Sequence, residues 1–275
     1  MKTVASRDNA GYKAMAKLAS SASERRRTGM SVLDGPHLLA AFLDSGRKPE
    51  ELMVSRMGLA DPEVARLVER SAPARVTLLS DTLFGSLTEH PSPTGVIASV
   101  RTPPARKAPA DASLVLLLED IQDPGNVGTL LRSAAAAGAQ SVLLSAKCAF
   151  AWSPKVLRSA MGAHFALNIV EGADLVAFLR EYRGRSIALA PRAKASLYDL
   201  DLVAPSAFIV GNEGTGVRPQ LLAAASVRAK IPMPGRVESL NAATAGSLCL
   251  FEAVRQRVTR AKKAEEPQMN TDEHR

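Results

Sequence analysis

The stretch LVLLLEDIQDPGNVGTLLR, residues 114–132, decides the fold of the larger part of this chain. Residues Leu114 to Leu118 form a continuous apolar run, which is typical of a strand buried on both faces of a sheet. Gly125 and Asn126 then open a stretch of helical composition that runs to Ala137, and Gly138 follows it in the position where helices commonly end. A buried strand that leads through a polar turn into a helix is the repeating unit of parallel α/β folds.

Further strand and helix signals follow this unit. Short β-type runs predict strands at residues 141–144, 186–189, 207–210 and 229–231. Near the end of the chain, apolar positions keep helical spacing at Leu240, Thr244, Leu248, Phe251, Val254 and Val258. The sequence therefore predicts an α/β domain whose parallel sheet is covered by helices and binds ligands at the carboxyl ends of its strands.

A linker separates this domain from a smaller one. Residues 101–112 begin with three prolines and three cations within ten residues, which disfavours both helix and strand. We therefore expect an N-terminal domain at 1–100, a C-terminal domain at 113–260 and a disordered polar tail at 261–275. In the N-terminal part, helix signals at Ala10–Ala22 and after Gly35 alternate with β-type runs at 76–79 and 96–100, so a small α/β domain is expected.

Composition bounds the class of protein. Of 275 residues 46% are apolar, and no apolar run approaches the roughly 20 residues that span a bilayer. The first residues lack the apolar core of a secretory signal, so we expect a cytoplasmic protein. The net charge of +8 favours a polyanionic partner such as a nucleic acid.

The residues that bind metals or perform covalent catalysis are sparse. Cys148 and Cys249 are far apart without C-x-x-C spacing, and the four histidines are scattered. No paired carboxylates and no convincing nucleophile–His–acid set are recognisable. We therefore predict no protein-bound metal.

Three polar, glycine-containing loops each follow a predicted strand. They cover residues 123–132, 211–216 and 231–241. Taken singly, each has a structural explanation, since Asp-Pro-Gly-Asn is a strong turn and Asn126 is a suitable helix cap. Residues 211–216 resemble a phosphate-binding glycine loop, but lack the G-x-G-x-x-G spacing. Together they are expected to converge on one crevice, because the carboxyl ends of parallel strands share an edge.

The expected crevice suits a ligand that is already activated. Glycines let backbone N–H and C=O groups approach an adenine edge, and Ile209, Ile231 and Met233 supply apolar walls. A site without a nucleophile or metal fits a reaction whose cofactor carries the chemistry. Methyl transfer from a sulfonium qualifies, since the protein mainly positions the partners.

These loops resemble the three motifs of the SpoU (TrmH-like) family of RNA ribose methyltransferases, within the SPOUT superfamily. The first resembles its Asn-x-Gly-x-x-x-Arg element at Asn126, Gly128 and Arg132, and the second its Gly-Asn-Glu-Gly-x-Gly element at 211–216. The third resembles its Ile-Pro-Met and Ser-Leu-Asn elements at 231–233 and 239–241, and residues 158–163 also look like a family segment. Ala242-Ala243 departs from the bulkier residues that are commoner there.

The N-terminal half resembles the family's ribosomal-protein-like substrate-binding domain. The matching stretches are residues 25–29 and 32–39, with Asp34 where Glu is more usual. The resemblance implies a C-terminal domain with a deep trefoil knot, a homodimer, and S-adenosylmethionine as the cofactor.

The resemblance also implies roles for individual residues. Residues expected to contact the cofactor are Ile209, Gly211, Glu213, Ile231, Met233, Ser239, Leu240 and Asn241. Those expected to act in catalysis are Asn126, Arg132, Glu213, Ser239 and Asn241. Those expected to contact RNA are Arg25, Arg26, Arg27, Arg132 and Arg158.

Arg132 is the residue likened to the family's catalytic arginine. Either it is deprotonated in a special environment beside a substrate phosphate, or it clamps that phosphate and orients the ribose hydroxyl. We favour the clamp, because a guanidinium stays protonated at almost any accessible pH. A surface arginine in a helical ion pair is the structural alternative, but no acid occupies position 128 or 136.

The function expected from the resemblance is methylation of a ribose 2′-hydroxyl of structured RNA. The appended N-terminal domain favours ribosomal RNA of the large subunit over transfer RNA. Two other classes stay open: an RNA-binding or assembly protein of the same fold without catalysis, and a nucleotide-binding oxidoreductase. The second lacks G-x-G-x-x-G after the first strand of its C-terminal domain.

Overall fold

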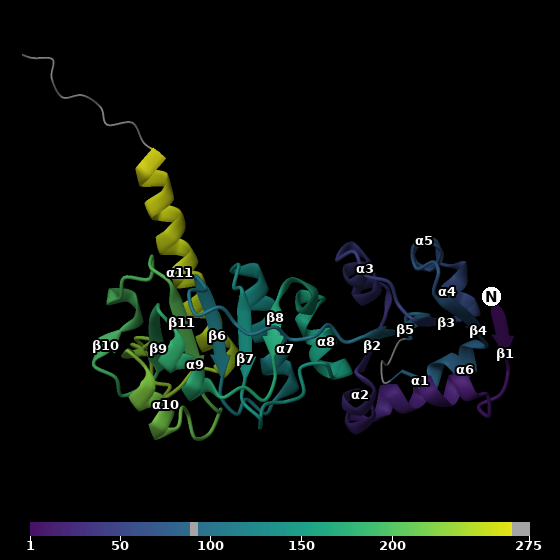
Figure 1. Cartoon of the computed structure of the whole chain (residues 1–275), viewed down its shortest axis with the longest axis horizontal. Helices are drawn as coiled ribbons and strands as arrows, with labels where there is room; N and C mark the ends of the chain where they lie inside the picture. The colour runs from purple at the N-terminus through teal and green to yellow at the C-terminus, as the bar shows by residue number, and fades with distance from the viewer. Residues whose placement is uncertain (89–92, 266–275) are drawn as a thin grey trace, which may run out of the picture.

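A computed structural model gives the structure of the protein and describes residues 1–88 and 93–265. Two α/β domains lie side by side along the long axis of the molecule, and the last helix projects from the C-terminal domain (Figure 1). Among the described residues, no helix is both long enough and apolar enough to cross a membrane.

The N-terminal domain is a mixed sheet with helices. Its strands are β1 (Lys2–Val4), β2 (Met30–Asp34), β3 (Glu51–Ser55), β4 (Arg75–Leu79) and β5 (Val96–Arg101). Its helices are α1 (Ala10–Ser20), α2 (Ala22–Thr28), α3 (Pro36–Asp44), α4 (Arg56–Ala60), α5 (Pro62–Arg70) and α6 (Asp81–Gly85). The strand order is β1-β4-β3-β5-β2, with β5 antiparallel to both of its neighbours.

The helix expected over Ala10–Ala22 is α1, which ends two residues earlier at Ser20, and a second helix follows from Ala22. Ser21 ends α1 in an extended conformation, and its side chain accepts a hydrogen bond from the Glu24 N–H as the N-cap of α2. A serine that caps a new helix stabilises a break that composition alone does not reveal.

The C-terminal domain is built on a seven-stranded parallel sheet in the order β10-β12-β9-β11-β6-β7-β8. Its strands are β6 (Leu114–Leu118), β7 (Ser141–Leu144), β8 (Asn168–Val170), β9 (Arg185–Leu189), β10 (Ala195–Ser196), β11 (Ser206–Val210) and β12 (Val227–Lys230). Its helices are α7 (Pro124–Ala136), α8 (Pro154–Ala160), α9 (Leu175–Glu181), α10 (Pro219–Ala224) and α11 (Ala242–Glu265), with short 3₁₀ turns η1 (Ala163–Ala166) and η2 (Leu197–Asp199). The α/β fold class predicted from the sequence is confirmed.

The order of strands places a topological switch point beside β6. The chain builds β6, β7 and β8 in one direction, and later returns β11 to the other side of β6. Loops that leave β6 and β11 therefore diverge at a switch point, which is where open parallel sheets bind ligands.

Two interactions explain how α7 begins and packs. The Asp123 carboxylate accepts a hydrogen bond from the Asn126 N–H at 2.8 Å, and Pro124 occupies the first helical position. Asp123 is therefore the cap, which frees the Asn126 side chain for other contacts. At Gly128 an added Cβ would lie 2.4 Å from Ser159 Cβ, so this glycine lets α7 and α8 approach closely.

The two domains share packing contacts. The rings of Phe42 in α3 and Phe165 in η1 meet edge to face with centroids 5.2 Å apart. The expected linker lies partly on the C-terminal domain, because the Arg106 N–H donates to Asn168 Oδ1 at 2.9 Å and Lys107 pairs with Glu181 at 2.8 Å.

The last helix has two unlike faces. Small or apolar side chains pack inward at Ala242, Ala243, Cys249, Leu250 and Ala253. Leu248, Phe251 and Val258, three of the apolar positions with helical spacing, are instead 38%, 47% and 49% exposed. The helix also continues to Glu265, past the expected domain end at residue 260, and residues 266–275 of the expected disordered tail lie outside the described residues.

Candidate active site

A pocket of about 720 Å³ opens at the carboxyl ends of β9, β11 and β12, a volume typical of small-molecule sites. Three loops line it: one after β9, one after β11, and the segment between β12 and α11. The residues expected to contact a cofactor that line it are Gly211, Glu213, Ile231, Met233, Ser239, Leu240 and Asn241.

One expected cofactor contact lies elsewhere. Ile209 is fully buried and packs with the cluster on the other face of the sheet. Its neighbour Val210 lines the pocket instead, since successive side chains of a strand alternate between faces.

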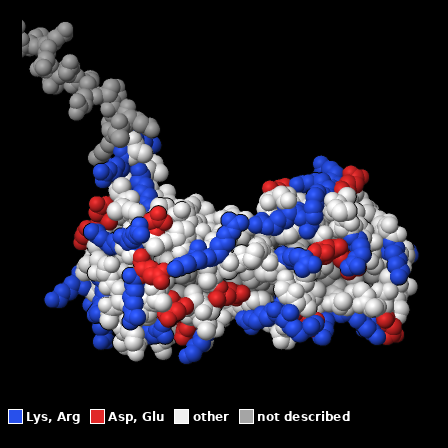
Figure 2. Space-filling model, in the orientation of Figure 1, with Lys and Arg blue, Asp and Glu red and all other residues white. Residues whose placement is uncertain are grey.

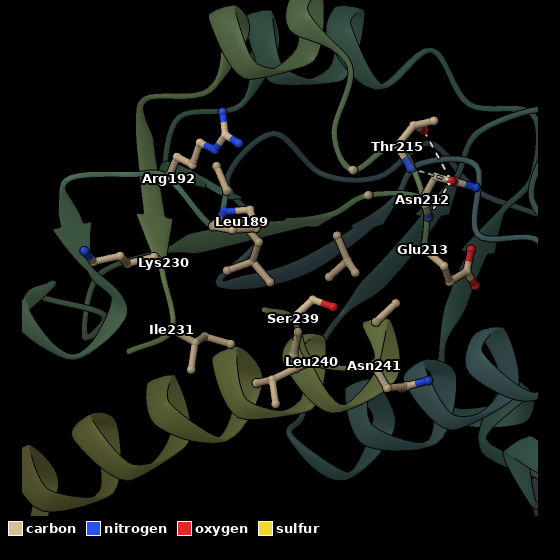
Figure 3. A pocket seen from close by; sticks show the side chains of 18 of the residues that line it. Leu189, Arg192, Asn212, Glu213, Thr215, Lys230, Ile231, Ser239, Leu240 and Asn241 are labelled. Atoms are coloured by element: carbon tan, nitrogen blue, oxygen red, sulfur yellow. Dashed lines mark hydrogen bonds between the residues drawn. The ribbon is translucent and has the colours of Figure 1, made fainter. Parts of the chain in front are cut away.

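A chain of hydrogen bonds joins three loops at one end of the pocket. Asn126 Nδ2 donates to Glu213 Oε1 at 2.9 Å, and Asn241 Nδ2 donates to Asn126 Oδ1 at 2.9 Å. The predicted convergence of Asn126, Glu213 and Asn241 is thus seen in a single chain. The Glu213 and Asn241 side chains lie at the same side of the pocket, with Ser239 between the loops (Figure 3).

Glu213 is held as a carboxylate. Partial burial opposes its ionisation, but hydrogen bonds from the Asn126 side chain and from backbone N–H groups, including that of Gln122, lower its pKa overall. An ionised Glu213 only accepts hydrogen bonds, so it fixes the orientation of the Asn126 amide.

Backbone packing shapes the loop after β11. At Gly211 an added Cβ would lie 2.3 Å from the Gly216 carbonyl carbon and from the Val217 nitrogen, so no larger residue fits. Asn212 Nδ2 donates to the Asp120 carbonyl at 2.8 Å, while its Oδ1 accepts from the N–H groups of Gly214 and Thr215.

An ion pair between buried Glu119 and half-exposed Arg218 braces the same loop. Glu119 is 2% exposed and accepts from the Arg218 N–H at 2.8 Å, and Arg218 Nε lies 2.6 Å from Glu119 Oε1. Burial raises the pKa of Glu119, which the contacts with Arg218 offset only in part. The ends of β6 and of the glycine loop are thereby fastened to each other.

Asn241 has a second role. Its Oδ1 accepts from the N–H groups of Ala243 and Thr244 at 2.8 and 3.2 Å, as the cap of α11. One side chain therefore orients Asn126 and starts the last helix.

Arg132 does not line the pocket of its own chain. It is exposed on α7, six residues or about 9 Å along the helix from Asn126. No hydrogen bond or ion pair joins it to any residue that the structure describes.

The other arginines expected to contact RNA lie near the junction of the domains. Arg25 is 5% exposed and donates to the Ala19 carbonyl at 2.9 Å, whereas Arg27 pairs with Glu24 at 2.5 Å. Arg26 is exposed and its guanidinium lies 4.2 Å from the centre of the Phe150 ring. Arg158 lines a small hollow between α1 and α8.

The sequence analysis missed part of the pocket. Leu189 at the end of β9 and Arg192 in the loop after it line the pocket together with Lys230 at the end of β12. Arg192 and Lys230 stand opposite Glu213 and Asn241 (Figure 3). The strand before this loop was predicted, so the same argument from strand ends would have found the loop.

The pocket fits S-adenosylmethionine. Apolar side chains and a glycine loop with exposed backbone groups suit an adenosine, and Glu213 supplies a negative charge for a cationic group. Within residues 1–88 and 93–265, no group of three or more His, Cys, Asp or Glu side chains is placed to hold a metal ion.

Known proteins share both domains. Residues 113–251 match the model of the SpoU rRNA Methylase family, and residues 9–98 match an MRM3-like substrate binding domain. The chain is 34% identical to an uncharacterized tRNA/rRNA methyltransferase of Synechocystis over 84% of its length and 86% of that protein. It is 31% identical to the 23S rRNA (guanosine(2553)-2′-O)-methyltransferase RlmP of Bacillus subtilis over 91% of its length and 98% of that protein.

Solved structures of RNA methyltransferases share the fold of nearly the whole chain. A crystal structure of an RNA 2′-O ribose methyltransferase superposes with a TM-score of 0.80 at 30% identity, covering 93% of this chain and 99% of that one. The SpoU methyltransferase AviRb of Streptomyces viridochromogenes, in complex with AdoMet, gives a TM-score of 0.82 at 25% identity, covering 91% and 99%. The expected family and two-domain fold are confirmed, and with them the trefoil knot follows by homology. The chain belongs to the SpoU rRNA methylase family.

Proposed function

We propose that this protein transfers a methyl group from S-adenosylmethionine to a ribose 2′-hydroxyl of large-subunit ribosomal RNA. The observation that carries the proposal is the hydrogen-bonded chain Glu213–Asn126–Asn241 at one end of a pocket suited to adenosine. Relatives that bind AdoMet and methylate 23S rRNA support it.

The protein's part in this reaction is mainly positioning. The cofactor supplies a methyl group on a sulfonium whose departure leaves a neutral thioether. Gly211 lets backbone groups approach the adenosine, and Ile231 and Leu240 supply apolar contacts. Asn126 and Asn241, held in fixed orientation by the Glu213 carboxylate, present a rigid polar wall to the incoming ribose.

Arg132 acts in this proposal as a phosphate clamp supplied by a second copy of the chain. Its helix α7 packs against α11, which carries an exposed apolar stripe, and the Ser133 and Ser247 hydroxyl oxygens lie 2.7 Å apart between the two helices. An exposed stripe of Leu248, Phe251 and Val258 is the kind of surface that two subunits cover. α11 also begins at the pocket, so pairing through it brings Arg132 of one subunit near the pocket of the other.

The surface charge supports an RNA substrate. Lys and Arg side chains extend across both domains and along the waist between them on the face seen in Figure 2, in keeping with a net charge of +8. The N-terminal domain, matched to a substrate binding domain, favours ribosomal over transfer RNA.

Incubation with methyl-labelled S-adenosylmethionine and separated ribosomal and transfer RNA tests the proposal. We expect label in large-subunit RNA and, after complete digestion, in a 2′-O-methylnucleoside. Label in transfer RNA instead would identify transfer RNA as the substrate. Label on a base would refute ribose chemistry, and cofactor binding without transfer to any RNA would indicate a protein that has lost catalysis.

A further inference from the structure

A second hollow, of about 370 Å³, lies at the junction of the two domains. It shares no lining residue with the cofactor pocket, and is bounded by Arg26, Leu144, Ser145, Ala146, Cys148, Glu171 and Gly172. The N-terminal domain contributes Arg26, while the loops after β7 and β8 contribute the rest. The N-terminal domain therefore closes one side of the hollow.

Arg26, which lines the hollow, is stacked on an aromatic ring. The Arg26 guanidinium lies 4.2 Å from the centre of the Phe150 ring, and Arg25 lies 5.8 Å from the same centre. Arg25 is buried and bonded to the Ala19 carbonyl, so it anchors the start of α2. Arg26 is exposed and lines the hollow, which leaves part of its planar group for another flat partner.

A carboxylate lines the same hollow. Glu171 Oε1 accepts a hydrogen bond from the Ala151 N–H at 2.8 Å, which holds the side chain in place. Glu171 and Arg26 both line the hollow, but among the described residues they form no ion pair with each other. The Glu171 oxygens keep lone pairs that can accept from two adjacent N–H donors of a ligand.

The hollow is tied to the reaction site through the loop after β6. Ala149, next to Phe150, donates its N–H to the Ile121 carbonyl at 2.8 Å. Ser145 donates to Asp120 Oδ1 at 2.5 Å, and the Asp120 carbonyl in turn accepts from Asn212 of the glycine loop. Neighbouring strands are about 4.8 Å apart, so the hollow lies within a few nucleotides' reach of Asn126.

We propose that this hollow binds one unstacked base of the substrate RNA, with guanine preferred. RNA-binding proteins read splayed bases by stacking them on aromatic or guanidinium groups and bonding their Watson–Crick edges. Arg26 on Phe150 supplies the stacking surface, and Glu171 accepts from the N1–H and the N2 amino group of guanine. The inference rests on the proposed function, and it gives that function a specificity element outside the catalytic pocket.

Labelled single-stranded RNA hexamers test it with the full-length protein. The probes are six uridines and the same hexamer with a single guanosine or a single inosine, which lacks the N2 amino group. We expect the guanosine hexamer to bind at least fivefold more tightly than hexauridine, with inosine between them. Glu171→Gln keeps an acceptor for the Ala151 N–H and should erase this preference, while Arg26→Ala should weaken binding of all three.

Lys13→Ala is the matched control, since Lys13 is an exposed cation of the same domain that is paired with Asp8 on the surface. We expect it to keep the preference for guanosine. Equal binding of all three hexamers by the wild-type protein, or a preference that survives Glu171→Gln, overturns the inference.

Methyl transfer measured on the same preparations separates this inference from the proposed function. Glu171→Gln should raise KM for ribosomal RNA at least fivefold with kcat within twofold and unchanged affinity for S-adenosylmethionine. If the wild-type protein methylates ribosomal RNA but Glu171→Gln leaves KM unchanged, only the inference fails. If the wild-type protein transfers no methyl group, the proposed function fails first.

Discussion

Asn126 donates a hydrogen bond to Glu213 over 2.9 Å although 87 residues separate them in the chain. Asn241 completes the contact by donating to Asn126 Oδ1. Because Asp123 caps α7, the Asn126 side chain serves this junction and not the helix start. The three motif loops are thus joined through a single amide.

Removing the Asn126 amide should slow methyl transfer and leave cofactor binding almost unchanged. Asn126→Ala leaves Glu213 and Asn241 without their shared partner, and misplacement by about 1 Å is enough to slow a positioned reaction about 100-fold. Single-turnover transfer rates measure the loss, and calorimetry should show S-adenosylmethionine affinity little changed. Thr129→Ala, exposed on the same helix, serves as the control. A rate within threefold of wild type would show that the junction does not position the reaction.

The glycine loop offers a matched pair of substitutions. In Gly211→Ala the new Cβ meets backbone atoms at 2.3 Å, whereas in Gly214→Ala the nearest atom, Asn212 Oδ1, is an ordinary 3.6 Å away. We expect Gly211→Ala to weaken cofactor affinity by at least about tenfold, or 1.4 kcal/mol, and Gly214→Ala to stay near wild type. Titration calorimetry with S-adenosylmethionine decides, and equal affinities would contradict the close packing of this loop.

Arg132 should matter for transfer and not for cofactor affinity. Arg132→Ala is expected to abolish methylation while S-adenosylmethionine binding stays within about tenfold, roughly 1.4 kcal/mol. Retained turnover would exclude both the base and the clamp.

Mixed dimers test which subunit Arg132 serves. Arg132→Ala and Asn126→Ala proteins, each with almost no activity alone, should regain about a quarter of wild-type activity when refolded together, because half of randomly paired dimers then carry one intact site of two. An arginine that serves its own pocket would give no recovery.

The exposed stripe of α11 should control assembly. Phe251→Glu places a charge in the proposed subunit interface and should weaken pairing by at least about 2 kcal/mol, roughly thirtyfold. Sedimentation across a concentration series measures it. Arg260→Glu, exposed about 180° around the helix from Phe251, is the control. A wild-type monomer, or a dimer unaffected by Phe251→Glu, would exclude this face.

His164 should make the fold sensitive to acid. It is 1% exposed and its Nε2 lies 2.7 Å from the Ala151 carbonyl, and burial lowers its pKa to about 4. As the pH falls below the ordinary value of 6.5, the unfolded chain takes up the proton first, so stability is lost between about pH 6.5 and 4. The full loss of folding stability from this shift in the pKa of His164 is about 3 kcal/mol.

Urea unfolding at pH 7 and pH 4.5 tests this effect in wild type and His164→Gln, which keeps a donor for the carbonyl. The variant should lose much less stability between the two pH values. The same loss in both proteins would assign the acid sensitivity to other groups.

Much of the fold could be predicted because the buried strands of a parallel sheet have a recognisable sequence pattern. Leu114–Leu118 is apolar throughout since both of its faces are buried, and β6 has those bounds. The break at Ser21 was missed because serine is tolerated within helices and only its capping contact reveals the break. The knot has no signature in local periodicity and entered only through the family resemblance.

The site could be predicted only in part. Loops after parallel strands must share an edge, so Asn126, Glu213 and Asn241 could be brought together from their positions alone. Ile209 was assigned to the pocket without regard to the alternation that puts Val210 there. Arg192 belongs to no recognised motif, and Arg132 reaches a pocket in our proposal only through a second subunit, which one sequence does not display.

The most direct test is a map of ribose methylation across all cellular RNA from cells with and without this protein. We predict that a 2′-O-methyl mark in large-subunit ribosomal RNA disappears without the protein and returns with the wild type, but not with Arg132→Ala. An unchanged map of ribose methylation would contradict the proposal that the three motif loops, at residues 123–132, 211–216 and 231–241, hold a methyl donor against an RNA ribose.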